Sequence, residues 1–447
     1  MGYGNVYSNK PFERASKTSH TGIINDAAVR DFLCTCTFPL LQNEINDHDS
    51  ILEEMQPVSE NPIKTIITID GGYTNVVVEE AFPSSTIAFF QFGVLFFKYE
   101  DLLELERKPF IDPDDFAKIQ NIQRLKLVIP TKGVSIKGQK DLISSVRKAL
   151  YDFFMSAPDK KEDKTYMQSL KWFLFEEYSL NAPKPWHLAT CPYCSKGLDI
   201  ECSKISRSFT TPCPFCGGEI YLTDVFRLHE AIDNELGAGG ILGYITTTVE
   251  QMTIVFLIHQ ILNLQPSLLK SCLIIKDGPL AFFGQTANMY KPMRSLVRFL
   301  HKKHAIYLVG LEKSGAFVEH AAQISERMKP KQFLMLGNKH IYKYIIPGTV
   351  EEHRPYADTS YYSSKLIFKS VFENVYVATI PNIYAKVEPT RDDYLNLDVI
   401  LHNITALKCD LYYNSLVPVV MVNKLVSLAD HPSSDVLRSF AQENIQH

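Results

Sequence analysis

The sequence lacks the features that mark three common classes of protein. No run of about 20 apolar residues is free of polar or charged interruption, so we expect no membrane span. The first twenty residues contain no apolar segment of the kind found in secretory signals, so we expect none. No G-x-x-x-x-G-K-[S/T] loop occurs, so the chain encodes no P-loop motor. These absences favour a cytoplasmic protein that makes no contact with a membrane.

A strong excess of positive charge is also absent. The formal net charge is −4, so the overall composition does not argue for binding to nucleic acid. Residues 291–343 are a local exception, with eleven Lys or Arg against three Glu. Such a stretch can lie along a phosphate backbone, and the alternative is a solvated surface that acids elsewhere in the fold balance.

Cysteine is sparse but unevenly placed. Four of the nine cysteines form two C-x-x-C pairs, which are Cys191, Cys194, Cys213 and Cys216. Their spacing is typical of Cys₄ zinc sites, whose closed tetrahedral shell is structural. Four reduced cysteines that meet by chance are the alternative. Cys202, between the pairs, is expected to be a packing residue.

Hydrophobic patterning predicts an α/β fold with a mixed sheet flanked by helices. Strands are expected at 63–70, 73–81 and 85–97, with Gly71-Gly72 breaking the first from the second. Residues 101–180 look mostly helical, helices and strands alternate beyond 240, and 414–440 looks mixed. We expect four segments: an N-terminal arm (1–60), the first part of a core with a helical region (61–180), a zinc-ribbon-like insertion (181–226) and the second part of the core (227–447).

Two aspartates occupy equivalent local contexts. Asp70 and Asp277 each end an apolar strand and precede a glycine. On neighbouring strands they would place two carboxylates at one edge of a sheet, where Mg²⁺ or Mn²⁺ finds the oxygen ligands it prefers. Two such ions could activate water and stabilise the leaving oxygen of a phosphodiester. An ordinary Asp-Gly turn is the alternative for either residue.

Four further residues are candidates for the same site. Glu250 lies near the start of an apolar helix predicted at 246–264, where it could be either a ligand or, with Thr247, part of a capping box. Lys313 follows a strand and could neutralise a phosphate, or it could be a solvated lysine. His402, on the apolar stripe of a helix at 391–404, could bind metal or move a proton, or it could be a core residue. Tyr394 lies on roughly the same face.

Taken in order, these residues resemble the NurA family of nucleases. The resemblance rests on Asp70-Gly71, on Glu250 before the Asp277-Gly278-Pro279-Leu280 strand, on Gly310 to Lys313, and on Tyr394 with His402. It covers about 63–100 and 240–405. The resemblance implies an RNase H-like fold, a homodimer and a HerA-like hexameric ATPase as partner. It also implies that the protein cleaves DNA with Mn²⁺ or Mg²⁺, which Asp70, Glu250 and Asp277 would hold with His402 assisting. DNA end processing and anti-phage defence are both compatible with it.

One departure from the family pattern concerns Glu250. The gap between Asp70 and Glu250 is longer than usual in the family, because the helical region and the cysteine module lie inside it. Glu79, Glu80 and Glu230 are therefore rival third ligands.

Two other functions fit parts of the sequence. Ile69 to Thr74 resembles the first phosphate hairpin of actin- and sugar-kinase-like phosphotransferases, although Pro279 and Leu280 make Asp277-Gly278 a poor second hairpin. A zinc-ribbon adaptor without enzymatic activity is the other alternative, and it predicts that Asp70 and Asp277 are dispensable.

Overall fold

The chain divides into two units, Met1–Asn46 and Asp47–His447. The structure, a computed structural model, describes residues 19–36, 52–79, 84–106, 122–158, 163–349, 351–409, 412, 414–428 and 432–444. In the first unit these residues form α1 (Ser19–Ile24) and α2 (Ala27–Thr35), which begins where Asp26 accepts a hydrogen bond from the Ala28 N–H. The second unit begins before residue 60, where the arm was expected to end, because β1 (Leu52–Glu54) belongs to its sheet.

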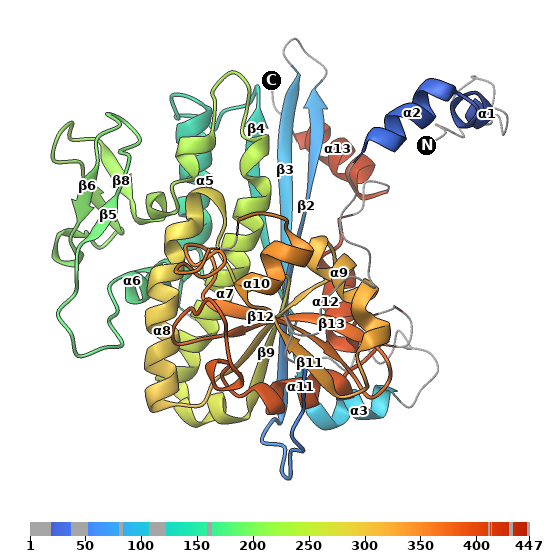
Figure 1. The fold of residues 1–447 in the computed structure, drawn as a ribbon. Helices are drawn as coiled ribbons and strands as arrows, with labels where there is room; N and C mark the ends of the chain where they lie inside the picture. The colour runs from blue at the N-terminus through green and yellow to red at the C-terminus, as the bar shows by residue number, and fades with distance from the viewer. Residues whose placement is uncertain are drawn as a thin grey trace. The chain divides into compact units, whose positions relative to one another are not determined.

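A nine-stranded sheet runs through the second unit (Figure 1). At one end β2 (Thr65–Glu79), β3 (Ser85–Lys98) and β4 (Ile122–Lys132) form an antiparallel meander. β9 (Cys272–Asp277) pairs parallel to β2, and β10 (Tyr307–Glu312) pairs parallel to β9. Antiparallel pairing then continues through β13 (Val375–Pro381), β12 (Ser363–Lys369), β11 (Gln332–Met335) and β1. The predicted α/β class with a mixed sheet is confirmed.

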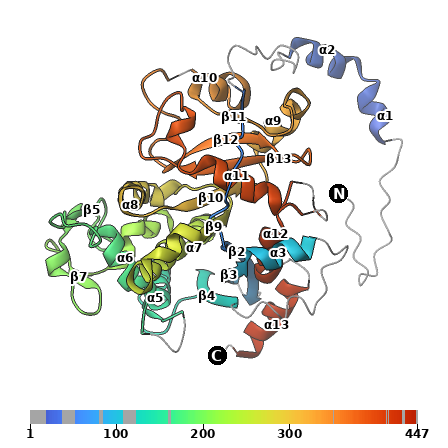
Figure 2. The ribbon, with the colours of Figure 1, turned by 90° about the horizontal axis from the view of Figure 1, so that it is seen from below.

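Helices cover both faces of this sheet (Figure 2). One face packs under α5 (Leu142–Met155), α6 (Tyr166–Leu174), α7 (Leu242–Leu264) and α8 (Tyr290–Lys303). The other packs under α11 (Leu397–Ala406) and α12 (Val417–Val426). Residues alternate between the faces along β2. Ile67 and Ile69 therefore join the hydrophobic core under α5 to α8, which we call the α7 core, and Ile66 joins the core under α11 and α12, which we call the α12 core. The remaining α-helices are α3 (Tyr99–Glu106), α9 (Ala316–Ile324), α10 (Asn338–His340) and α13 (Ser433–Asn444).

α7 is the central helix of the α7 core. The helical stretch Gly239–Leu264, which includes α7, is long and apolar enough to cross a membrane. However, 78% of the apolar 18-residue window within it is buried inside the protein. α7 begins at Leu242, so Thr247 and Glu250 lie in its interior. The interpretation of Glu250 as part of a capping box is therefore wrong.

Three expectations about strands need correction. Gly71-Gly72 does not break the first strand, because β2 pairs with β3 continuously from Thr65 to Val77. The described residues of 101–180 include, besides the helices, a strand that was not expected, because β4 forms an outer strand of the sheet there. The described part of 414–440 contains the helices α12 and α13 and no strand.

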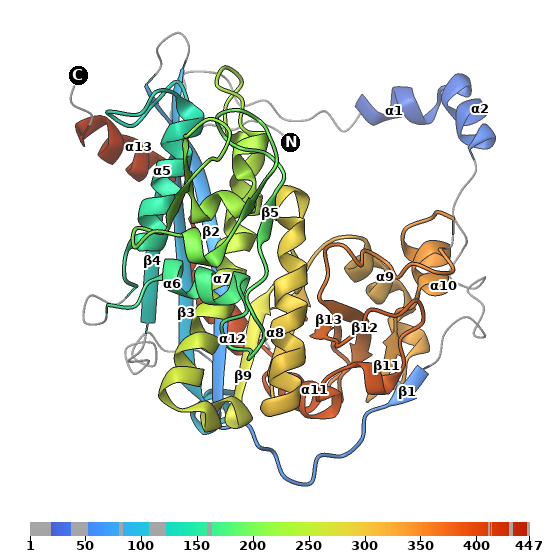
Figure 3. The same ribbon diagram turned by 90° about the vertical axis from the view of Figure 1, so that its left-hand side faces the viewer.

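The cysteine module is a pair of small antiparallel sheets beside the α7 face (Figure 3). β5 (Trp186–Leu188) pairs with β6 (Leu198–Ile200), and β7 (Thr210–Pro212) pairs with β8 (Glu219–Tyr221). Arg147 of α5 anchors the module through two hydrogen bonds to Asp224, of 2.8 and 2.7 Å, and one of 2.9 Å to the Glu219 carbonyl. Its guanidinium lies between the rings of Tyr193 and Tyr221, 4.9 Å from each centroid. The module is thus fixed to the core by a buried ion pair.

Candidate active site

Two aspartates meet where β9 ends beside β2. The parallel register pairs Ile69 with Lys276, so Asp70 and Asp277 are the next residues along the two strands. Asp70 faces α12, because Gly93, its partner on β3, would place a Cβ against three side chains of α12. The register gives Asp277 the same side. The two aspartates lie side by side on neighbouring strands as predicted, but only Asp277 ends its strand, because β2 continues beyond Asp70 to Glu79.

Glu250 reaches the same place from the opposite face. It lies on α7, is only 5% exposed, and its Oε1 would lie 3.1 Å from a Cβ at Gly71. That Cβ would also lie 2.7 Å from Cδ1 of Phe92, so a side chain at position 71 would displace one of these neighbours. On the α12 face, a Cβ at Gly72 would lie 2.6 Å from the Val426 carbonyl oxygen. The glycine pair allows side chains and backbone to approach β2 closely from both faces.

Two lysines pair with these carboxylates. Lys276 Nζ lies 2.6 Å from Glu250 Oε2, and these side chains are 3% and 6% exposed. Lys313, just after β10, places its Nζ 2.5 Å from Asp277 Oδ2, with side-chain exposures of 33% and 13%. Lys313 is thus at the site, as predicted. Lys276 was missed, although a lone lysine in an apolar strand next to Asp277 was a usable signal.

The pKa of Asp70 is strongly perturbed. Burial, with the nearby carboxylates of Asp277 and Glu250, raises the pKa of Asp70 from 3.8 to about 7. Its Oδ1 accepts a hydrogen bond of 2.8 Å from the Gly71 N–H, whereas the buried Oδ2 has no partner within the described chain. Burial also raises the pKa of Glu250, and the ammonium of Lys276 opposes that shift.

Asp70 and Asp277 offer oxygen ligands of the kind that a hard divalent cation prefers. Asp70 Oδ2 is a buried acceptor that nothing in the described chain satisfies, whereas Glu250 Oε2 already pairs with the ammonium of Lys276. A cation beside Asp70 and Asp277 would relieve the mutual repulsion that raises the Asp70 pKa. A cation held there would polarise a bound phosphate and lower the pKa of a water bound to it.

The rival ligands lie elsewhere. Glu230 pairs with Arg227 at 2.6 Å. Glu79 is exposed and lies nine residues beyond Asp70 on β2, and Glu80 lies outside the described residues. Glu250, Glu79 and Glu230 are the three candidate third ligands that the structure describes. Of these, only Glu250 lies close to Asp70.

The structure does not bring Tyr394 and His402 into contact with the carboxylates. Tyr394 is 4% exposed, and its hydroxyl donates a 2.7 Å hydrogen bond to the Lys365 carbonyl. His402 is half-buried on α11, which packs on the α12 face. Across the described ranges, no hydrogen bond or ion pair links either residue to Asp70, Glu250 or Asp277.

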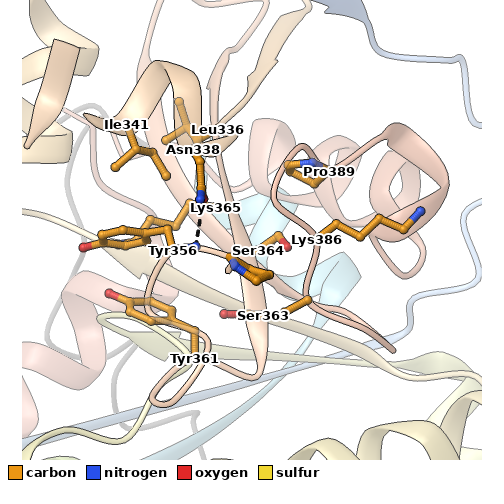
Figure 4. Close-up of a pocket in the computed structure, with 12 residues that line it drawn as sticks. Leu336, Asn338, Ile341, Tyr356, Tyr361, Ser363, Ser364, Lys365, Lys386 and Pro389 are labelled. Carbon is orange, nitrogen blue, oxygen red and sulfur yellow. Dashed lines mark hydrogen bonds between the residues drawn. The ribbon is translucent and has the colours of Figure 1, made fainter. Parts of the chain in front are cut away.

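A small pocket lies next to β12 (Figure 4). Lys365, at its base, is 4% exposed and pairs with Glu312, the residue before Lys313. Asn338 donates to the Glu351 and Arg354 carbonyls and accepts a 2.8 Å hydrogen bond from the Tyr356 N–H. Lys365 and Asn338 therefore already have partners within the protein.

The four predicted cysteines form a second site. The sulfur atoms of Cys191, Cys194, Cys213 and Cys216 all lie within 4.8 Å of one another, which could hold a structural metal ion such as zinc. Cys191 and Cys213 are buried, Cys194 is partly buried and Cys216 is exposed, so the site lies at the border between the α7 core and the surface. Cys202 is half-buried and packs against this core, as expected of a packing residue.

Comparison with known proteins adds no assignment. No protein-family model matches the chain, and no curated protein matches it.

Proposed function

We propose that this protein is a metal-dependent DNA nuclease with an RNase H-like core, similar to the NurA family. The observation that carries the proposal is the meeting of Asp70 and Asp277 at the β2–β9 edge, with Glu250 behind them and one Asp70 oxygen unpartnered. Buried acids are costly unless a proton, a partner or a cation compensates them, and strongly perturbed acids gather at functional sites. A divalent cation is the compensation that this oxygen-rich set fits.

The strand order supports the fold part of the proposal. An RNase H-like sheet extends an antiparallel three-stranded meander by strands parallel to its first member. The succession β4-β3-β2-β9-β10 has this arrangement, with Asp70 on the first strand and Asp277 at the end of the next. The strands beyond β10, the helical region and the cysteine module are additions to that core.

Each residue has a role in the proposed reaction. Asp70 and Asp277 would hold Mn²⁺ or Mg²⁺, which when bound polarises the phosphodiester and activates water. Lys313, one-third exposed at the mouth of the site, can leave Asp277 and neutralise a non-bridging oxygen of the phosphate. The resemblance to the NurA family gives His402 an assisting role; it lies on α11, and no hydrogen bond or ion pair of the described residues links it to Asp70 or Asp277.

The phosphotransferase alternative is disfavoured by a specific observation. A phosphate hairpin at Ile69 to Thr74 needs a turn, and β2 is fully paired with β3 through those residues. An Asp-Gly turn at Asp70 is excluded for the same reason.

A partner motor also belongs to the proposal. The chain has no P-loop and a net charge of −4, so it would hold DNA weakly by itself. We infer that it works as a homodimer on a HerA-like hexameric ATPase, which would feed DNA to the site during end processing or anti-phage defence. Co-purification with such an ATPase encoded nearby is the expected result, and a monomer that degrades long duplex processively alone would contradict it.

The decisive experiment is cleavage of labelled DNA with Mn²⁺ or Mg²⁺. Asp70→Ala and Asp277→Ala should each lower the rate roughly a thousandfold, a cost of about 4 kcal/mol in the transition state. Asp152→Ala, which removes a half-exposed aspartate from α5, is the matched control and should leave the rate unchanged. Wild-type rates in both site variants would end the nuclease proposal and favour the adaptor.

A further inference from the structure

Lys276 occupies a position that a metal ion would otherwise be expected to fill. Its Nζ lies 2.6 Å from Glu250 Oε2 and donates a 2.7 Å hydrogen bond to the Asp277 carbonyl. Its side chain is 3% exposed, whereas that of Lys313 is 33% exposed. The ammonium of Lys276 is therefore an enclosed component of the site, and that of Lys313 is a displaceable one.

We propose that Lys276 is a built-in cation that replaces a second metal ion, so that the site binds one divalent cation at Asp70 and Asp277. Glu250 then serves as the counter-ion of Lys276 and does not ligate the metal. This inference rests on the proposed function and departs from the two-metal arrangement that the sequence suggested.

Geometry separates Glu250 from the other two carboxylates. Asp70 and Asp277 lie side by side on the face toward α12, whereas Lys276 is one residue earlier on β9 and points to α7 and Glu250. An ion bound by Glu250 would have to displace the ammonium of Lys276, which already pairs with Glu250 Oε2. For Glu250 to become a ligand, Lys276 would have to be left charged and unpaired in the interior, which is strongly unfavourable.

Charge balance leads to the same count. Three carboxylates face the two ammonium groups of Lys276 and Lys313, so the fully ionised cluster carries one net negative charge. One divalent cation already reverses that charge, and release of Lys313 to the phosphate accommodates it. A second divalent cation would leave a large uncompensated positive charge in a buried place.

Mn²⁺ binding tests the inference without any measurement of activity. Mn²⁺ bound per chain is counted by titration, and electron paramagnetic resonance detects two coupled ions. The protein is the full chain with its cysteine site intact, and a double variant, Asp70→Ala with Asp277→Ala, gives the background from surface sites. Wild type should bind one Mn²⁺ above background and show no coupled pair.

Two variants isolate the ion pair. Lys276→Met should free Glu250 and add a second, coupled Mn²⁺, bound at least tenfold more tightly than any second ion in wild type. Lys276→Met with Glu250→Gln removes both charges, so the net charge is unchanged and the pair is replaced by neutral groups. This double variant should still bind one Mn²⁺, with a Kd within threefold of wild type, and it decides the question even if the single variant fails to fold.

The outcomes separate the two proposals. A coupled Mn²⁺ pair in wild type, or at least a tenfold loss of affinity in Lys276→Met with Glu250→Gln, would overturn the role given to Lys276. Wild-type binding no stronger than the Asp70→Ala, Asp277→Ala background would instead overturn the proposed metal-dependent function, and the inference with it.

Discussion

Gly71→Ala is the smallest change that perturbs the proposed site. The new Cβ would lie 2.7 Å from Phe92 Cδ1 and 3.1 Å from Glu250 Oε1. Phe92 and Glu250 are 1% and 5% exposed, so neither can swing into solvent. The chain must shift β2 against α7, and such overpacking costs about 1–3 kcal/mol of the free energy of unfolding.

Urea denaturation of the metal-free protein measures this cost. Gly243→Ala, at the start of the same helix α7, is the matched control because its Cβ would have no heavy atom within 4 Å. The control should be neutral or gain up to about 1 kcal/mol, since alanine suits a helix better than glycine. If Gly71→Ala unfolds within about 0.3 kcal/mol of wild type, the close approach of Glu250 to β2 is wrong.

Three further predictions concern the rest of the second unit. Arg147→Met should cost about 3–5 kcal/mol of unfolding free energy, because it leaves Asp224 buried and unpaired. Lys148→Met, which removes the exposed pair with Asp152, should cost under about 0.5 kcal/mol. Equal costs of the two variants in urea denaturation would refute the anchoring role of Arg147. Burial lowers the pKa of His320 from 6.5 to about 4, so the folded state binds fewer protons than the unfolded state and stability should fall by up to about 3 kcal/mol as the pH drops from about 6.5 to 4. His320→Gln should weaken this dependence of stability on pH. An unchanged pH dependence in the variant would contradict the attribution of the effect to His320. Elemental analysis should find one tightly bound zinc per chain that Cys191→Ser loses together with the fold of the module, and four titratable thiols in the folded wild type would refute this.

The features predicted correctly from the sequence have local signals. The C-x-x-C pairs predicted the cysteine site because two short turns fix four sulfur atoms with little help from the rest of the fold. Asp70 and Asp277 were found because each closes an apolar run before a glycine, and the parallel pairing of β2 with β9 places them side by side, although β2 itself continues past Asp70. Lys313 was found because it follows an apolar strand, and the parallel pairing of β10 with β9 brings it to Asp277.

The errors arose where distant contacts decide local structure. Gly71-Gly72 was interpreted as a break because glycine usually interrupts strands, but here Glu250 and α12 need the space that side chains would fill. β4 was missed although Leu125, Leu127 and Ile129 alternate with exposed residues, because the helical signal on both sides obscured a short alternating stretch. The pairing of Lys276 with Glu250 depends on how α7 packs on the sheet, which no local pattern encodes.

Locating the proposed divalent cation relative to Asp70 and Asp277 is the most direct test of the proposed nuclease site. Fe²⁺ can substitute for Mg²⁺ or Mn²⁺ at oxygen-rich sites and, with ascorbate and peroxide, cuts the protein backbone beside the bound ion. We predict two cuts in the full-length protein, one next to Asp70 and one next to Asp277, both suppressed by excess Mn²⁺ and absent from Asp70→Ala. Cuts confined to other regions, or cuts that persist in Asp70→Ala, would contradict the claim that the carboxylates of Asp70 and Asp277 hold the metal.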